Sequence, residues 1–159
     1  MSKSRVIEIH TIVPTDPDTV RRSLNRRLFE ALNPPFPPVK VLRFDGTDKG
    51  GITHLSLNFF LFKQEWISEN TESESGRDGA GFHFVDEGRK LPFFLAFWRH
   101  SHIFAEIPGD TELSFTRITD RIEYRGRGLM GLFLQPILIL QFKYRKPVYR
   151  KIASGEFLS

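Results

Sequence analysis

The sequence predicts an α+β fold in which seven antiparallel strands form a curved sheet around a long C-terminal helix. Several stretches alternate apolar and polar residues, which is typical of antiparallel strands covered on one side only. The 159 residues include 16 phenylalanines, an excess that favours a sheet with a wide apolar interior. Residues 129–152 are helical in pattern, and their first half is apolar nearly all round, so we expect this helix to be buried on every side.

The first part of the chain is predicted to form one strand and then two short helices. Residues 5–13 are rich in β-branched side chains, as a strand requires. Asp16 and Pro17 are typical of a helix N-cap and of the first helical position. Apolar residues then recur at helical spacing, in one continuous helix or in two short ones with a bend near Asn25. The proline cluster at 34–38 ends the helical region.

Four shorter strands are predicted in the middle of the chain, at residues 39–45, 52–62, 65–70 and 82–86. The strand at 52–62 places Leu55, Leu57, Phe59 and Leu61 on one face. Glycine-rich or polar residues mark the connections, with turns predicted at 46–51 and 88–90 and a mobile loop at 71–81. In the terminal helix, Pro147 is expected to cause a kink or an early end.

Residues 92–124 are predicted to form two long strands joined by a turn at Pro108-Gly109-Asp110. Even-numbered residues share a face in each strand, and these faces are expected to look inward. They comprise Trp98, His100, His102 and Phe104 on the first strand, and Ile118, Asp120 and Ile122 on the second. A hairpin assumed to fold about residues 109–111 places His100 near Asp120 and His102 one diagonal step away, whereas a register shifted by two places His102 opposite Asp120.

The length and composition indicate a single cytoplasmic domain over residues 1–159. Hydrophobic residues make up 40% and charged residues 26% of the chain, as in ordinary globular domains. No cysteine is present, which excludes disulfides and thiolate chemistry. The N-terminus does not resemble a secretory signal. The formal net charge is +4, and the cations at 21–27 and 143–151 are interpreted as solvated helix faces, so no nucleic-acid partner is expected.

Three segments resemble the SRPBCC superfamily. They are FVDEGRKLPFFLAFWRHSHIF at 84–104, TRITDRIEY at 116–124 and QFKYR at 141–145. The first is similar to the family's strand with WxHxHxF, in a branch that is largely uncharacterised. This superfamily includes START-like lipid carriers, polyketide cyclases and plant hormone receptors. The resemblance implies the helix-grip fold, with an apolar cavity between the sheet and the terminal helix that is open to hydrophobic ligands.

His100, His102 and Asp120 allow three interpretations. A buried carboxylate needs a partner whatever the function, so a structural ion pair is the simplest. One histidine oriented by Asp120 can instead act as an acid–base catalyst or bind the ligand directly. Two histidines and a carboxylate can also hold zinc, but side chains on flat strands rarely converge closely enough, so no metal is predicted.

The glycines at 126, 128 and 131 form a GxGxxG pattern between a strand and a helix. Dinucleotide sites also need a following strand and an acidic residue about 20 positions further on, and neither is present. We therefore predict that these glycines allow a turn and a close backbone approach, and that no cofactor binds.

The predicted function is binding or carriage of a small hydrophobic molecule such as a lipid, an isoprenoid or a polyketide. One alternative is a cyclase, dehydratase or isomerase that uses the His/Asp pair; another is a module that docks weakly on a membrane or on a partner protein through the terminal helix. The oligomeric state is left open. Residues expected to contact the ligand are Phe59, Trp66, Phe84, Trp98, His100, His102, Phe104, Ile118, Asp120, Ile122, Phe133 and Ile137.

Overall fold

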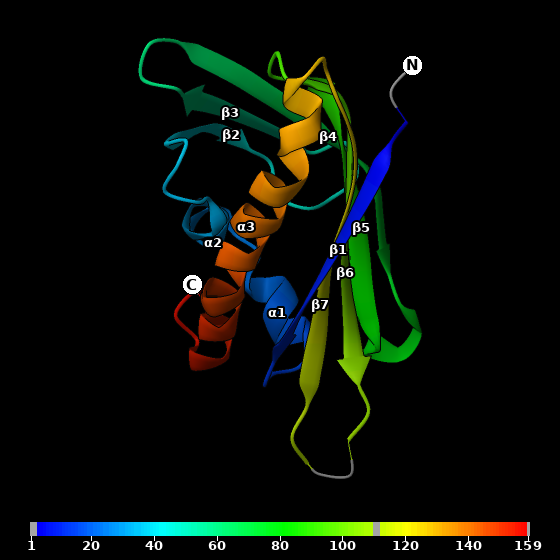
Figure 1. Cartoon of the computed structure of the whole chain (residues 1–159). Coiled ribbons are helices and arrows are strands. Elements are labelled where there is room, and N and C mark those ends of the chain that lie inside the picture. Colours follow the sequence, from blue (N-terminus) through cyan, green and yellow to red (C-terminus); the bar gives the residue numbers. More distant parts are fainter. Residues whose placement is uncertain (1–2, 110–111, 159) are drawn as a thin grey trace.

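A computed structural model describes residues 3–109 and 112–158 and has the predicted architecture (Figure 1). Its elements are β1 (Arg5–Val13), α1 (Pro17–Ser23), α2 (Arg26–Leu32), β2 (Val39–Phe44), β3 (Ile52–Asn58), β4 (Lys63–Ser75), η1 (Arg77–Gly79), β5 (Gly81–Lys90), β6 (Leu95–Ile107), β7 (Phe115–Gly126), α3 (Met130–Arg150) and η2 (Lys151–Ser154). The strands form one antiparallel sheet in the order β1-β7-β6-β5-β4-β3-β2. The sheet curves, and α3 crosses its concave face (Figure 1).

The predicted bend near Asn25 is the boundary between α1 and α2. Asp16 caps α1, since its Oδ1 accepts a hydrogen bond of 2.8 Å from the amide of Thr19. Asn25 caps α2 in the same way, and its Oδ1 lies 3.0 Å from the amide nitrogen of Leu28. Each cap satisfies an amide that a helix start leaves unpaired, which is why the region forms two short helices rather than one.

Strand β3 ends at Asn58, four residues before the predicted end at 62. The Asn58 side chain accepts a hydrogen bond of 2.9 Å from the amide of Phe60, and Phe60 has a φ of 67°. A left-handed residue here turns the chain directly into β4. Leu61 is therefore 95% exposed, not on the apolar face of a strand, and that prediction was wrong.

Strands β4 and β5 are longer than predicted. Most of the expected loop at 71–81 is strand, because β4 continues to Ser75 and pairs with the start of β5. The expected turn at 88–90 also lies within β5. Both segments are polar, and cross-strand ion pairs on the outer face stabilise them. The guanidinium of Arg99, for example, lies 2.6 Å from a carboxylate oxygen of Glu72 on β4 and also binds Glu87 on β5.

The β6–β7 hairpin has a register that differs by two residues from the expected one. His102, not His100, is the cross-strand partner of Asp120, and His100 lies opposite Ile122. The connection between the strands runs from residue 108 to 114, so it is longer than the tight turn assumed. Asp110 and Thr111 lie outside the described residues, so the predicted Pro-Gly-Asp turn is described only in part.

Helix α3 continues through Pro147 to Arg150, so the expected early end is wrong. Only one of its faces is buried, through Leu134, Leu138, Phe142 and Tyr149. Other apolar residues of its first half are exposed, which contradicts the expected burial on every side: Leu129, Met130, Leu132, Phe133, Ile137 and Leu140. Among the described residues, no helix has the length and apolar character needed to cross a membrane.

The buried apolar residues form two clusters that share α3. In one, α3 packs on β1 and β7, where Leu134, Leu138 and Phe142 meet Ile7, Ile9, Ile122 and Tyr124. In the other, the C-terminal end of α3 packs with α1, α2 and the far ends of β5 and β6. Strands β2, β3 and β4 contribute no buried residue to either cluster beside α3, and their inner faces bound a cavity.

Candidate functional site

A cavity of about 1040 Å³ lies between the concave side of the sheet and the two helices α2 and α3. Its walls come from β2, β3, β4, β5 and β6, whereas β1 and β7 are covered by α3 and contribute none of its lining residues. Most of the lining is apolar and includes Leu55, Leu57, Trp66, Phe84 and Trp98. This volume is sufficient for a small organic ligand.

Asp86, His100 and His102 are polar residues of the cavity wall, and with Asp120 behind them they form a cluster of two histidines and two aspartates on three adjacent strands. Asp86 comes from β5, His100 and His102 from β6, and Asp120 from β7. The side chains of His100 and Asp120 are 4% and 2% exposed, whereas those of Asp86 and His102 are 15% and 12% exposed. The cluster therefore consists of a buried pair, His100 and Asp120, and a pair that is more accessible from the cavity, Asp86 and His102.

Each carboxylate accepts one short hydrogen bond from an imidazole. Nε2 of His100 lies 2.8 Å from Oδ1 of Asp120, and Nε2 of His102 lies 2.8 Å from Oδ2 of Asp86. Both pairs are diagonal, since the cross-strand partners are Asp86 with His100 and His102 with Asp120. The two imidazole rings are in contact, with centroids 3.6 Å apart and their planes tilted by 35°. Because an ionised carboxylate only accepts, each Nε2 atom bears the proton.

Helix α3 adds a cation and a phenol to the same end of the cavity. Nη1 of Arg145 lies 3.7 Å from Oδ1 of Asp120, and its guanidinium lies 4.3 Å from the ring centroid of Phe142. Burial, and next the charge of Asp120, raise the pKa of Tyr149 well above its ordinary value. Tyr149 is therefore a neutral phenol. Arg145 and Tyr149 both line the cavity.

The surroundings set the ionisation of the cluster. Burial, and next the charge of His102, lower the pKa of His100 to about 4, so this imidazole is neutral at pH 7. Burial opposes ionisation of Asp86 and Asp120 as well. Even so, the hydrogen bonds from His102 and His100 respectively hold the pKa of each carboxyl below its ordinary value. At neutral pH the site thus contains two carboxylates, a neutral His100 and the guanidinium of Arg145.

Of the residues expected to contact a ligand, eight line the cavity: Phe59, Trp66, Phe84, Trp98, His100, His102, Phe104 and Ile137. Ile118, Asp120 and Ile122 do not line it, because β7 is covered by α3, although Asp120 bonds to His100. Phe133 is exposed on the outer side of α3.

Sequence reasoning missed Asp86, Arg145 and Tyr149. Asp86 had two signals, its place in the family segment and its even number, which puts it on the same strand face as Phe82 and Phe84. Arg145 stands in the QFKYR segment. Nothing in the sequence singled out Tyr149 as a neighbour of Asp120.

A metal ion could be held by Asp86, His100 and His102, whose ligand atoms lie within 4.8 Å of one another. This set contains Asp86 in place of the Asp120 considered from the sequence. The hydrogen bond between His102 and Asp86 already uses one nitrogen and one oxygen of the set, so a metal ion would have to replace that bond. That no metal binds therefore stays a prediction.

The GxGxxG glycines permit the close backbone approach that was predicted. A Cβ atom added to Gly126 would lie 2.3 Å from the Cα atom of Gly131. Gly128 has a φ of 57° and supplies the turn between β7 and α3. These glycines have a structural explanation that involves no nucleotide.

The arrangement of a curved sheet, a helix across its concave face and a cavity between them defines the helix-grip fold. Solved structures agree. The chain is similar to the Zhui aromatase/cyclase from Streptomyces sp. R1128, with 15% identity and a TM-score of 0.66 over 96% of this chain and 94% of the other. It is also similar to norcoclaurine synthase from Thalictrum flavum in complex with dopamine and hydroxybenzaldehyde, with 11% identity and a TM-score of 0.64 over 98% and 89%.

These likenesses confirm that the chain has the helix-grip fold. No protein-family model matches the sequence, and no curated protein matches it. At this level of identity the solved structures establish the fold, and a fold of this kind accommodates many functions.

Proposed function

We propose that this protein binds and carries a small hydrophobic molecule in the cavity beneath the sheet. The main support for this proposal is the cavity, which has a volume of about 1040 Å³ and a largely apolar lining. It opens to solvent near Phe36, Phe62 and Phe93, which line the cavity and are also exposed on the surface. An apolar ligand there would remove both its own surface and these side chains from water.

The proposed ligand has a hydrogen-bond donor, such as a hydroxyl or an ammonium group, at its inner end. Asp86 and Asp120 are ionised, and Arg145 is the one guanidinium among the cavity-lining residues. A carboxylate on the ligand would meet these two negative charges, whereas a donor would bond to Asp86, which faces the cavity.

Displacement of an apolar fluorescent dye tests the proposal, together with native mass spectrometry of the purified protein. We expect dye uptake, and we expect it to fall in Leu55→Trp, which places an indole in the cavity. Ile103→Trp adds the same bulk on the outer face of β6 and serves as the control. A long-chain alkyl amine should displace the dye at lower concentration than the carboxylate of equal chain length. Absence of both dye uptake and bound ligand would contradict the proposal.

A second candidate function is that of a cyclase, dehydratase or isomerase. The observation that favours it is the pair of Asp86 and His102, which lies on the cavity wall at 2.8 Å and is accessible from within. Such a pair can take a proton from a carbon next to a carbonyl, and can return one to a leaving hydroxyl, so that water is released.

Single substitutions separate the two functions. In a catalyst, His100→Ala and His102→Ala would abolish dehydration of a β-hydroxy ketone, followed by the absorbance of the conjugated product, while the protein stays folded. In a carrier, His102→Ala would change the affinity for amines. Neither the wild type nor the variant would then catalyse the dehydration. If the substitutions chiefly lower the melting temperature, the cluster is structural.

A further inference from the structure

We propose that the rim of the cavity docks on an anionic phospholipid bilayer, so that the ligand passes between the bilayer and the cavity without crossing water. The docking surface consists of four segments, residues 33–41, 56–64, 91–97 and 125–146, which we call the rim segments. Passage of a ligand rests on the proposed binding function. Docking itself does not, and it is tested separately below.

The rim segments contain most of the large apolar side chains that the fold leaves exposed. Phe60, Leu61 and Leu129 are 78%, 95% and 79% exposed. Several rim residues are both exposed and part of the cavity lining, and so mark its opening: Phe36, Phe62, Phe93, Met130, Ile137 and Leu140. A continuous exposed apolar surface of this kind indicates contact with a partner or a membrane.

Contacts between the rim segments show that they form one surface. The ring of Phe36 stacks on Phe60, and Phe62 packs against Phe93, with centroids 5.8 Å apart in each case. The side chain of Gln141 in α3 donates a hydrogen bond to the carbonyl of Phe36. The amide of Arg127, just before α3, donates to the carbonyl of Phe94 at 2.8 Å.

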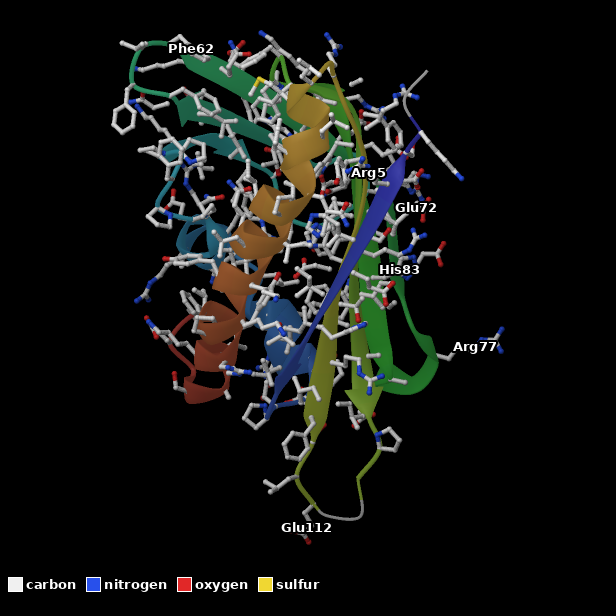
Figure 2. The ribbon with its side chains drawn as sticks, in the orientation of Figure 1. Arg5, Phe62, Glu72, Arg77, His83 and Glu112 are labelled. Atoms are coloured by element: carbon white, nitrogen blue, oxygen red, sulfur yellow. The ribbon has the colours of Figure 1, made fainter. Side chains whose placement is uncertain are left out.

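The turn at Phe60 keeps its neighbours outside the core. The positive φ of Phe60 and the hydrogen bond from its amide to Asn58 fix the tip between β3 and β4. Fixed in this way, Leu61 extends away from the fold and could enter a bilayer without any rearrangement of the sheet. In Figure 2, Phe62 marks this tip, and Glu112 marks the β6–β7 connection at the opposite end of the molecule.

The charges of the rim segments favour an anionic bilayer over a second copy of the chain. The four segments contain no aspartate or glutamate, and besides Arg145, which pairs with Asp120 inside the fold, they include Lys40, Lys63, Arg125, Arg127, Lys143 and Lys146. Two such rims face to face would bring like charges together, whereas an anionic lipid surface complements them. Apolar tips flanked by cations are typical of proteins that lie on the membrane interface.

Sedimentation with vesicles tests the proposal. We expect the protein to bind vesicles of phosphatidylcholine mixed with phosphatidylglycerol more tightly than vesicles of phosphatidylcholine alone, and we expect salt to weaken the binding. The double variant Leu61→Ser/Leu132→Gln should bind at least about tenfold more weakly, because two apolar side chains no longer enter the bilayer. Lys63→Gln should weaken binding by about fivefold.

Leu113→Ser is the matched control, since Leu113 is 67% exposed but follows Glu112 at the far end of the molecule. It should bind vesicles as the wild type does. Dye displacement in solution should be equal in wild type and double variant, so failure of docking and failure of ligand binding are separate results. Docking is overturned if the wild-type protein does not bind the mixed vesicles, or if the double variant binds them as tightly as the wild type does. It is also overturned if size-exclusion chromatography shows a stable dimer that the double variant abolishes.

Discussion

Nε2 of His100 lies 2.8 Å from Oδ1 of Asp120, and both side chains are almost completely removed from solvent. Asp120→Ala would leave the His100 N–H without its acceptor and the Arg145 guanidinium without its ion-pair partner. We therefore expect the free energy of unfolding, measured with urea, to fall by about 3 kcal/mol. Asp86→Ala is the comparison: Asp86 faces the cavity, where water can replace it, so a loss of about 1 kcal/mol is expected. Equal losses of unfolding free energy in the two variants would show that both carboxylates stabilise the fold to the same extent.

The depressed pKa of His100 makes stability depend on pH. In the unfolded chain this imidazole is protonated below about pH 6.5, but in the folded protein only below about pH 4. Its contribution is complete above pH 6.5 and is lost as the pH falls through about 4, a difference of about 3 kcal/mol. Urea unfolding across this range should show a weaker decline for His100→Gln, which keeps a donor but does not titrate. The same decline in both proteins would mean that His100 is not held neutral by burial.

Tyr124 is completely buried, and its hydroxyl is the one buried side-chain group in the described part of the chain without a hydrogen-bond partner. Tyr124→Phe removes this polar atom and keeps the ring. We expect the free energy of unfolding to rise by about 1 kcal/mol, because no hydrogen bond is lost and the desolvation penalty disappears. Thermal unfolding monitored by circular dichroism would detect the change. A lower melting temperature would indicate that the hydroxyl has a partner in solution, such as a bound water molecule.

The contact between Gly126 and Gly131 fixes the start of α3 against the end of β7. In Gly126→Ala the new methyl group would lie 2.3 Å from the Cα atom of Gly131, and we expect a loss of about 1–3 kcal/mol. Gly128→Asn is the control, because asparagine tolerates a positive φ and nothing lies within 4 Å of the added Cβ. Its effect should stay within about 0.5 kcal/mol. If Gly126→Ala is as mild, backbone movement at the junction must absorb the clash.

The fold was predictable because its main determinants are local. Strand alternation put Trp98, His100, His102 and Phe104 on one inward face, Asp16 marked a helix start, and a bend was expected near Asn25. The hairpin register was not predictable, since it depends on the length of the 108–114 connection, which the Pro-Gly-Asp pattern understates. A polar strand such as the end of β4 was mistaken for a loop because its stabilising partners come from neighbouring strands.

The site was predictable only in part, because side-chain pairing depends on geometry that residue spacing does not contain. The hydrogen bond between His100 and Asp120 was expected, but it forms across a diagonal and not between directly opposed residues. Asp86 and Arg145 enter the cluster from β5 and α3, and only the folded chain shows that they meet. The exposure of Leu132 and Leu140 was also hidden, since a helix that is apolar all round gives no indication of which face is covered.

Because α3 packs along β1 and β7 and leaves the inner faces of β2, β3 and β4 to the cavity, a guest molecule would act as the missing part of the hydrophobic core for those three strands. Protein loaded at a hundredfold excess over the dissociation constant would gain roughly 2.7 kcal/mol of unfolding free energy by mass action. Material purified from cells would then melt in two transitions, one for the loaded and one for the empty population, and extraction with organic solvent would merge them into the lower one.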